Sequence, residues 1–384
     1  MQQTISRRML GRLAVTVLAV VAALAPAVVP AAAAAGFTVV SSPNVGTTND
    51  NQFNAVAVLS PTNVWAVGHF TATVAPPNLR SIVEHFDGTR WSVVTNPHPN
   101  DEDRLNGIAA DSASDVWAVG LSATNAGTDF PLVEHFNGTS WSQVTVPNPG
   151  TQIVLRGVAA ISPTNVWIVG FANVATPATF IEHFDGTAWS IVPSPNPANG
   201  GLLAAITAIS PTDIWAVGSM IVTVNGVSFR EPLTEHWDGM RWSIVAPPPT
   251  GQGDLLGSAA SSSSDVWAVG VSGGNQLIEH WNGSQWSIVT APSPNDTSLN
   301  AVTVLGPADA WAVGDGNFSG AGTALIEHWD GSAWRVVTSP TGSEDGYLSG
   351  VSSLSGGLVW AVGNQIPNTT TFIVDTLALR DTAG

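Results

Sequence analysis

The sequence predicts an all-β protein built from seven copies of one unit of four antiparallel strands. Two short strings that recur at regular spacing support this fold class. The string Trp-Ala-Val-Gly, or a one-residue variant of it, returns about every 49 residues, starting at Trp65, Trp117, Trp167, Trp215, Trp267, Trp311 and Trp360. The string Glu-His-Phe/Trp-Asp/Asn-Gly starts at Glu84, Glu134, Glu182, Glu235, Glu279 and Glu327. Four-stranded units with a period of about 40 to 50 residues are typical of β-propeller blades, so seven copies predict seven blades.

Each unit contains four short segments with strand composition, separated by turn residues. The first turn has the pattern Ser-Pro-Thr-Asn, as at Ser60–Asn63, in which proline presets φ for a tight turn. The third and fourth strands are joined by Asp-Gly-Thr, as at Asp87–Thr89, where glycine supplies the positive φ of a hairpin. In the second unit the predicted strands are Leu105–Ala110, Asp115–Leu121, Leu132–Phe136 and Trp141–Val146.

The two ends of the repeat array predict how the ring closes. The seventh unit has the string at Trp360 and a third-strand candidate, Phe372–Leu377, but it has no fourth-strand Trp. Near the N-terminus, Phe37–Asn44 matches Trp189–Asn196 in register. We therefore expect the N-terminal strand to complete the last blade, which joins the two ends and removes a free sheet edge.

The order of these motifs resembles kelch and galactose-oxidase-type propellers over residues 37–379. In both, an apolar strand ends in Gly, as at Gly120, the next ends in an aromatic residue, and Trp follows. This chain differs in having single glycines, and Phe136 or Trp237 where kelch units usually have Tyr. The Val-Trp-Ala-Val step with a later Gly-x-x-Trp is also similar to the shorter tectonin-type lectin repeats. The oxidase reaction of the resembled family needs a Cys-crosslinked Tyr, and this chain has no Cys, so we expect a non-oxidase.

Residues 1–35 have the composition of an export signal. Arg7, Arg8 and Arg12 precede an apolar run at Leu13–Val29, and small residues follow up to Ala35. The segment around Arg7 and Arg8 also resembles the twin-arginine pattern, so Sec and twin-arginine export are alternatives. We expect a secreted, extracellular protein in which residues 36–384 form a single propeller domain.

Composition excludes several classes of partner and site. The chain has 11 basic and 28 acidic residues and a net charge of −17, which argues against nucleic acid or an anionic membrane surface as the partner. After removal of the signal we expect no membrane association. Without Cys, disulfides, thiolate metal sites and Cys nucleophiles are excluded. We expect a monomer held together by its apolar core.

The recurring His and Glu residues are expected to be structural. The histidines, at His85, His135, His183, His236, His280 and His328, would lie about 51° apart around a seven-fold ring, so they cannot converge on one metal ion. We expect each His to bond a neighbouring turn. The Glu before each His faces the opposite side of its strand, and we expect it to form a hydrogen bond between blades.

Loop lengths indicate which face carries function. The first and third turns of each unit share one face and hardly vary, whereas the loops of the other face range from short, as at Ser272–Gln276, to long, as at Ser219–Pro232. A rigid scaffold with variable loops on one face is typical of a binding surface. Near the channel mouth, eleven positions before each repeat Trp, lie Asn54, Asn106, Arg156, Ala204, Leu256, Asn300 and Ser349. The five polar ones, Asn54, Asn106, Arg156, Asn300 and Ser349, are the predicted ligand contacts.

These loops are acidic, and they suggest one cofactor. Asp101, Glu102 and Asp103 offer oxygen ligands for Ca²⁺, with a solvated acidic loop as the alternative; no other cofactor is expected.

The first function hypothesis is a secreted binding or scaffold propeller that recognises an extracellular or cell-wall carbohydrate or a protein. A glycoside hydrolase or polysaccharide lyase that uses two loop carboxylates is the second. A structural surface or assembly protein is the third. No catalytic residue is predicted.

Overall fold

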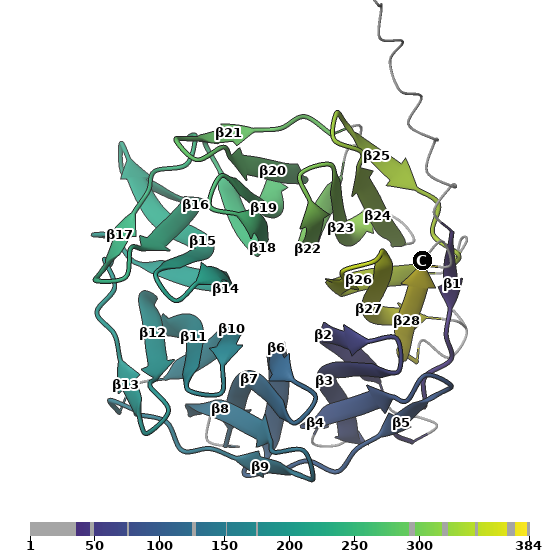
Figure 1. Ribbon diagram of the computed structural model, residues 1–384. Helices are drawn as coiled ribbons and strands as arrows, with labels where there is room; N and C mark the ends of the chain where they lie inside the picture. Colours follow the sequence, from purple (N-terminus) through teal and green to yellow (C-terminus); the bar gives the residue numbers. More distant parts are fainter. Residues whose placement is uncertain are drawn as a thin grey trace, which may run out of the picture. The chain divides into compact units, whose positions relative to one another are not determined.

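The computed structural model describes residues 36–381, with short gaps at 47–49, 75–76, 125–127, 151, 174–175, 292–295, 317–321, 342–344 and 367–372. The predicted export signal lies outside the described residues. Within them the chain forms 28 strands and no helix. The strands form seven four-stranded antiparallel sheets, which stand as blades around a central opening (Figure 1). The predicted seven-bladed propeller is confirmed.

The strands are assigned to blades in chain order. Blade 1 contains β2 (Asn51–Ser60), β3 (Asn63–Val74), β4 (Pro77–Phe86) and β5 (Trp91–Val93). Blade 2 contains β6 (Glu102–Ser112), β7 (Asp115–Ala123), β8 (Asp129–Phe136) and β9 (Trp141–Gln143). Blade 3 contains β10 (Ile153–Ser162), β11 (Asn165–Ala172), β12 (Ala178–Phe184) and β13 (Trp189–Ile191). Blade 4 contains β14 (Gly201–Ser210), β15 (Asp213–Val224), β16 (Val227–Trp237) and β17 (Trp242–Ile244).

The remaining blades follow the same order. Blade 5 contains β18 (Gly253–Ser262), β19 (Asp265–Ser272), β20 (Asn275–Trp281) and β21 (Trp286–Ile288). Blade 6 contains β22 (Thr297–Gly306), β23 (Asp309–Gly316), β24 (Thr323–Trp329) and β25 (Trp334–Val337). Blade 7 contains β26 (Asp345–Leu354), β27 (Leu358–Ile366), β28 (Asp375–Asp381) and the N-terminal strand β1 (Phe37–Val39).

The ring closes as the sequence predicts, because β1 pairs with β28, with Phe37 opposite Asp381. Phe37 takes the place of the missing fourth-strand Trp, and its ring meets that of Trp311 edge to face at 5.5 Å. The predicted third strand of blade 7 is present, but its bounds differ: β28 begins at Asp375 and not at Phe372, which lies outside the described residues, and it continues beyond Leu377. The strand runs on to Asp381 because Arg380 pairs with Trp360, as His does with Trp in the other blades.

Strand lengths in blade 2 also differ from the prediction. Its three inner strands are longer, because β7 and β8 continue their pairing beyond the repeated strings, up to Ala123 and Asp129. The fourth strand ends at Gln143 instead of Val146, since β9 pairs with β8 over only three positions. The outer strands of the ring are therefore short and the inner hairpins long, which places most of the sheet around the channel.

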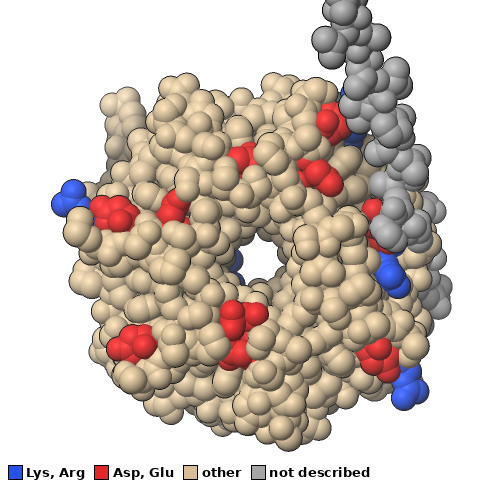
Figure 2. All heavy atoms as spheres, viewed as in Figure 1, with Lys and Arg blue, Asp and Glu red and all other residues tan. Residues whose placement is uncertain are grey.

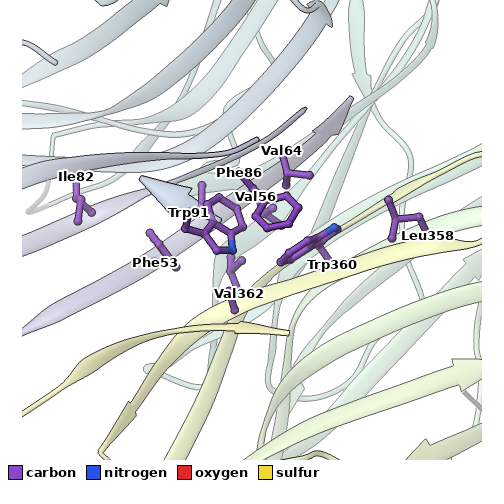
Figure 3. Packing of buried hydrophobic residues seen from close by; sticks show 11 residues of the cluster. Phe53, Val56, Val64, Ile82, Phe86, Trp91, Leu358, Trp360 and Val362 are labelled. Atoms are coloured by element: carbon purple, nitrogen blue, oxygen red, sulfur yellow. The ribbon is translucent and has the colours of Figure 1, made fainter. Parts of the chain in front are cut away.

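The apolar core lies between neighbouring blades. Figure 3 shows the contact of blades 1 and 7, where Trp360 of β27 lies against Phe86 and Trp91 of blade 1. The ring centroids of Trp360 and Trp91 are 5.3 Å apart and nearly perpendicular. Trp65 packs in the same way on Phe136 and Trp141 of blade 2. Each repeat Trp is thus a contact to an adjacent blade, which explains why the string recurs in every unit.

The recurring histidines bond the first turn of their own blade, as predicted. The Nε2 of His85 lies 2.9 Å from Oδ1 of Asn63, and its ring lies over Trp65 at 4.4 Å. The other five pairs have the same arrangement. In blade 7, Arg380 replaces the His and lies over Trp360 at 5.9 Å. Each His thus connects the first turn of its blade to the third strand.

The recurring glutamates are fully buried between blades, but the prediction that all of them bond across blades was wrong for two. Glu84, Glu134 and Glu235 accept hydrogen bonds from residues that follow the preceding blade, and Glu327 accepts one from Gln276 within it. Glu182 and Glu279 make no hydrogen bond within the described residues.

Candidate functional site

One residue on the first strand of every blade turns into the channel because the strand carries a β-bulge. In blade 1, Phe53 pairs with Gly68 and Ala55 pairs with Val67, so Asn54 between them has no opposite residue on β3. A bulge re-aims the side chain of its extra residue. The seven bulge residues are Asn54, Asn106, Arg156, Ala204, Leu256, Asn300 and Ser349. All seven line a channel cavity of about 190 Å³.

The Gly of the repeated Trp-Ala-Val-Gly string makes this bulge possible. A Cβ added to Gly68 would lie 1.9 Å from the carbonyl oxygen of Gln52, and one added to Gly170 would lie 2.0 Å from that of Val154. No side chain fits at such distances. The Gly of the repeated Trp-Ala-Val-Gly string therefore allows the bulge residues to project into the channel.

Three of the predicted ligand contacts connect adjacent blades. The Nδ2 of Asn54 donates to the carbonyl of Leu105 at 2.7 Å, and that of Asn106 donates to the carbonyl of Leu155 at 2.8 Å. Asn300 donates to the carbonyl of Leu348 at 2.9 Å and also to Asp315. Each asparagine thus satisfies a carbonyl beside the bulge of the next blade. The spacing of these residues in the sequence did not predict this structural role.

Arg156 differs from the other bulge residues. Its guanidinium lies 5.5 Å from the ring centre of Phe171, in a cation–π contact. It forms no hydrogen bond or ion pair with any described residue, and the residue is exposed within the channel although the ring surrounds it. Burial and the nearby Arg230 lower the pKa of Arg156, but an arginine stays charged. The side chain is therefore a fixed cation with free donors.

A second channel cavity of about 300 Å³ lies around this arginine. It is lined by Asn106, Arg156, Ala204, Leu256 and Asn300, which come from five consecutive blades. We call these five residues the channel site. Figure 2 shows the central opening of the ring, with basic side chains at its wall. On the face shown there, the acidic side chains form small separate patches. Asn54 and Ser349, the other two predicted contacts, line the first cavity and lie outside the channel site.

The structure does not bring the three acids of the calcium hypothesis together. Asp103 is fully buried, where it pairs with Arg80 at 3.2 Å and accepts a hydrogen bond from Ser122 at 2.6 Å. Glu102 pairs with Arg104, and Asp101 precedes β6. Among the described residues, no group of three His, Asp or Glu side chains could hold a metal ion. Asp103 and Glu102 thus serve as partners of loop arginines and of a hydroxyl.

Other acids of the long-loop face are engaged in the same way. Asp254 pairs with Arg230 at 3.2 Å, and Glu231 accepts hydrogen bonds from the backbone and the hydroxyl of Thr250. Asp315 accepts from Asn300 at 2.7 Å. The second function hypothesis needs a pair of carboxylates available to a sugar, and these acids are bound to neighbours.

In the described part of the chain, no helix has both the length and the apolar character that a membrane crossing requires.

Comparison with known proteins identifies the fold. No protein-family model matches the sequence, and no curated protein matches it. Similar solved structures include YCF48 bound to a D1 peptide, with 17% identity and a TM-score of 0.57, covering 90% of this chain and 96% of that one. YCF48 from Cyanidioschyzon merolae has 14% identity and a TM-score of 0.56, covering 90% and 98%. The WD40 repeats of RRP9 have 10% identity and a TM-score of 0.57, covering 90% and 97%.

At these identities the similarity shows the fold alone. The chain is a seven-bladed propeller with neighbours that include WD40 repeats. None of these three neighbours is described as a kelch protein, so the kelch resemblance stays a prediction.

Proposed function

We propose that this protein is a secreted binding propeller that holds a protein partner at the channel site. One observation carries the proposal. Around the ring the bulge position is filled by five residue types, while the Trp, Gly and Glu-His framework beside it repeats almost unchanged. A scaffold that repeats its frame and varies the residues aimed into one cavity is suited to recognition of a specific ligand.

Two further observations favour a protein over a carbohydrate. None of the seven bulge residues is aromatic, and all sixteen tryptophans belong to the repeated framework between blades. The channel therefore offers amide, cationic and aliphatic groups, which match the groups of a peptide. The similar propeller YCF48 has been solved with a D1 peptide bound, which supports peptide recognition by a ring of this kind.

The test compares peptides with glycans on the purified protein. A random-peptide display library and a glycan array are screened with the wild type, with Ala204→Trp, which fills the channel site, and with Met240→Trp as the matched control. Met240 is 84% exposed in the turn between β16 and β17, on the face of the constant turns. We expect wild type and Met240→Trp to enrich the same peptides, and Ala204→Trp to lose at least about tenfold in affinity. Binding of glycans alone contradicts the proposal.

Secretion rests on residues 1–35 and has its own test. Expression of the chain with and without this segment, followed by assay of the culture medium, should place the protein outside the cell only when the segment is present. Retention of both forms in the cell would contradict the secreted location.

A further inference from the structure

We propose that the channel site takes a peptide segment that carries one carboxylate next to an apolar side chain, with the carboxylate seated on Arg156. This inference rests on the proposed function and names the chemistry of its ligand. Both a Glu or Asp side chain and a free C-terminus supply such a carboxylate, and the experiment below distinguishes them.

The guanidinium of Arg156 supplies the anion-binding half. It is oriented by its contact with Phe171, and all five of its N–H donors lack an acceptor among the described residues. Inside a ring of protein, a carboxylate that accepts two of these hydrogen bonds is the strong and geometrically specific partner of such a cation. The neighbouring Asp254 pairs with Arg230 at 3.2 Å and acts on Arg156 only at longer range, so no described carboxylate is paired with the Arg156 guanidinium.

The charge of the whole chain limits how much negative charge the ligand carries. With a net charge of −17, the protein repels nucleic acids and acidic polysaccharides at long range. A ligand with one carboxylate is repelled only weakly and still forms the full contact with Arg156. The observations therefore favour a single anionic group within an otherwise uncharged segment.

Two aliphatic side chains next to Arg156 supply the apolar half. Ala204 and Leu256, from the next two blades, line the same cavity and are only half-buried. A cavity of about 300 Å³ is at the small end of ligand pockets, large enough for one or two side chains. On the other side of Arg156, the Oδ1 of Asn106 accepts no hydrogen bond within the described residues and is available to a peptide N–H.

The experiment pans two random heptapeptide libraries, one displayed with free C-termini and one fused through them, against four proteins. These are the wild type, Arg156→Gln, Arg156→Lys and the control Arg335→Gln. Arg335 is an exposed arginine paired with Asp330 in the β24–β25 hairpin. We expect wild type and the control to enrich peptides with a carboxylate beside Leu, Ile, Val or Phe. Enrichment only with free C-termini assigns the carboxylate to the chain end, and enrichment in both libraries assigns it to a side chain.

Synthetic peptides then give the decisive comparison. Neutralising the carboxylate of the best peptide, by amidation or by Asp→Asn or Glu→Gln, should weaken binding to wild type at least tenfold and leave binding to Arg156→Gln unchanged. Arg156→Lys should recover only part of the affinity, because an ammonium lacks the planar fork. Enrichment of peptides without Asp or Glu from the library fused through its C-termini, or binding by Arg156→Gln within twofold of wild type, would overturn this inference and leave the proposed function standing. Failure of all four proteins, the wild type included, to enrich any peptide contradicts both.

The folding of Arg156→Gln is controlled separately. Arg156→Gln removes the contact with the Phe171 ring, but the guanidinium forms no hydrogen bond with the described residues, so the variant should keep a thermal midpoint close to that of the wild type and the same circular dichroism spectrum. A loss of peptide binding with an unchanged midpoint is then a loss of ligand contact.

Discussion

Six of the seven joints between neighbouring blades contain a buried glutamate of the third strand, and these six are of two kinds that differ in what faces the carboxyl. In a partnered joint the carboxyl accepts a hydrogen bond: Asn96 donates to both oxygens of Glu134 at 3.2 Å, and Ser194 donates to Glu235 at 2.9 Å. In an unpartnered joint it does not, as for Glu182 between blades 2 and 3. Both kinds occur in one ring with the same repeated framework.

The difference comes from one position in the connection between blades, five residues after the fourth-strand Trp. It holds Asn96 and Ser194 in partnered joints, but Val146 before Glu182 and Pro247 before Glu279. Valine and proline side chains cannot donate a hydrogen bond. Between blades 5 and 6 this position is Ala291, and Gln276 of β20 reaches Glu327 at 3.0 Å instead. The repeat thus fixes the glutamate, and the connecting segment decides whether it is satisfied.

Burial explains why an unpartnered glutamate is tolerated. Removal from water raises the pKa of Glu84, Glu134, Glu182, Glu235 and Glu279 to about 8. At neutral pH these groups are therefore largely protonated, and the unpartnered joints bury a neutral acid. An unpaired neutral polar group costs about 1–3 kcal/mol, far less than a buried charge.

The largest effect should be the same in both kinds of joint, because apolar contact holds them together. Trp65 in a partnered joint and Trp215 in an unpartnered one are both buried, and neither indole N–H has a partner among the described residues. We expect Trp65→Ala and Trp215→Ala each to lower the free energy of unfolding by about 3–5 kcal/mol. Denaturant titration measures both. A loss confined to one variant would show that the polar contacts dominate.

Exchanging the connecting residue should convert one kind of joint into the other. Asn96→Leu removes the donor of Glu134 and should destabilise the protein by about 1–3 kcal/mol. The reciprocal change, Val146→Asn, places a donor beside Glu182 and should stabilise it by about 1 kcal/mol. Midpoints of urea unfolding at pH 7 report both. Shifts of the same sign in the two variants would refute the distinction between the joints.

Replacing the glutamate itself should have opposite signs in the two kinds of joint. Blade 7 has Leu379 at this position, so the site accommodates leucine. Glu182→Leu removes an unpaired polar group and should stabilise by about 1 kcal/mol, whereas Glu134→Leu leaves the amide of Asn96 with one acceptor fewer and should destabilise by about 1 kcal/mol. Thermal unfolding of both variants tests the signs. Destabilisation by Glu182→Leu would mean that this carboxyl has a favourable contact after all.

The repeat made most of the fold predictable, because each blade reuses the same local solution. Seven copies of the Trp string predicted the blades, and the match of Phe37 to Trp189 predicted the closing strand. The start of β28 was misplaced because blade 7 lacks the Glu-His string that marks the register elsewhere. Arg380 and Leu379 occupy those two positions, and only their pairing with β27 shows it.

The channel site was predictable in position and only partly in role. Spacing from the repeat Trp identified the bulge residues, including Arg156. The role of Asn106 was not predictable, because it depends on the carbonyl of Leu155 in another blade. The same holds for Glu182, whose environment is set by a connection about forty residues earlier. Contacts across a joint depend on two units at once, and a repeat pattern describes only one.

The smallest expected effect is a change in the pH dependence of stability. An unfolded glutamate titrates near 4.5, whereas the folded carboxyl of Glu182 has a pKa of about 8. Between these values the folded state holds a proton that the unfolded state has released, so this group's contribution is complete below about pH 4.5 and is lost as the pH rises through about 8. The lowered pKa of His85 and His183 acts in the opposite sense below about 6.5.

Measurements between about pH 7 and 9 therefore isolate the glutamates. Stability should fall across this range, and Glu182→Leu should make the fall shallower because one of the six groups is gone. Leu379→Glu should make it steeper, since it adds a buried acid to the last joint. If both variants keep the wild-type slope, the buried carboxyls are already ionised at neutral pH. The unpartnered joints would then bury a charged carboxylate, and another cause would be needed to explain why the fold tolerates it.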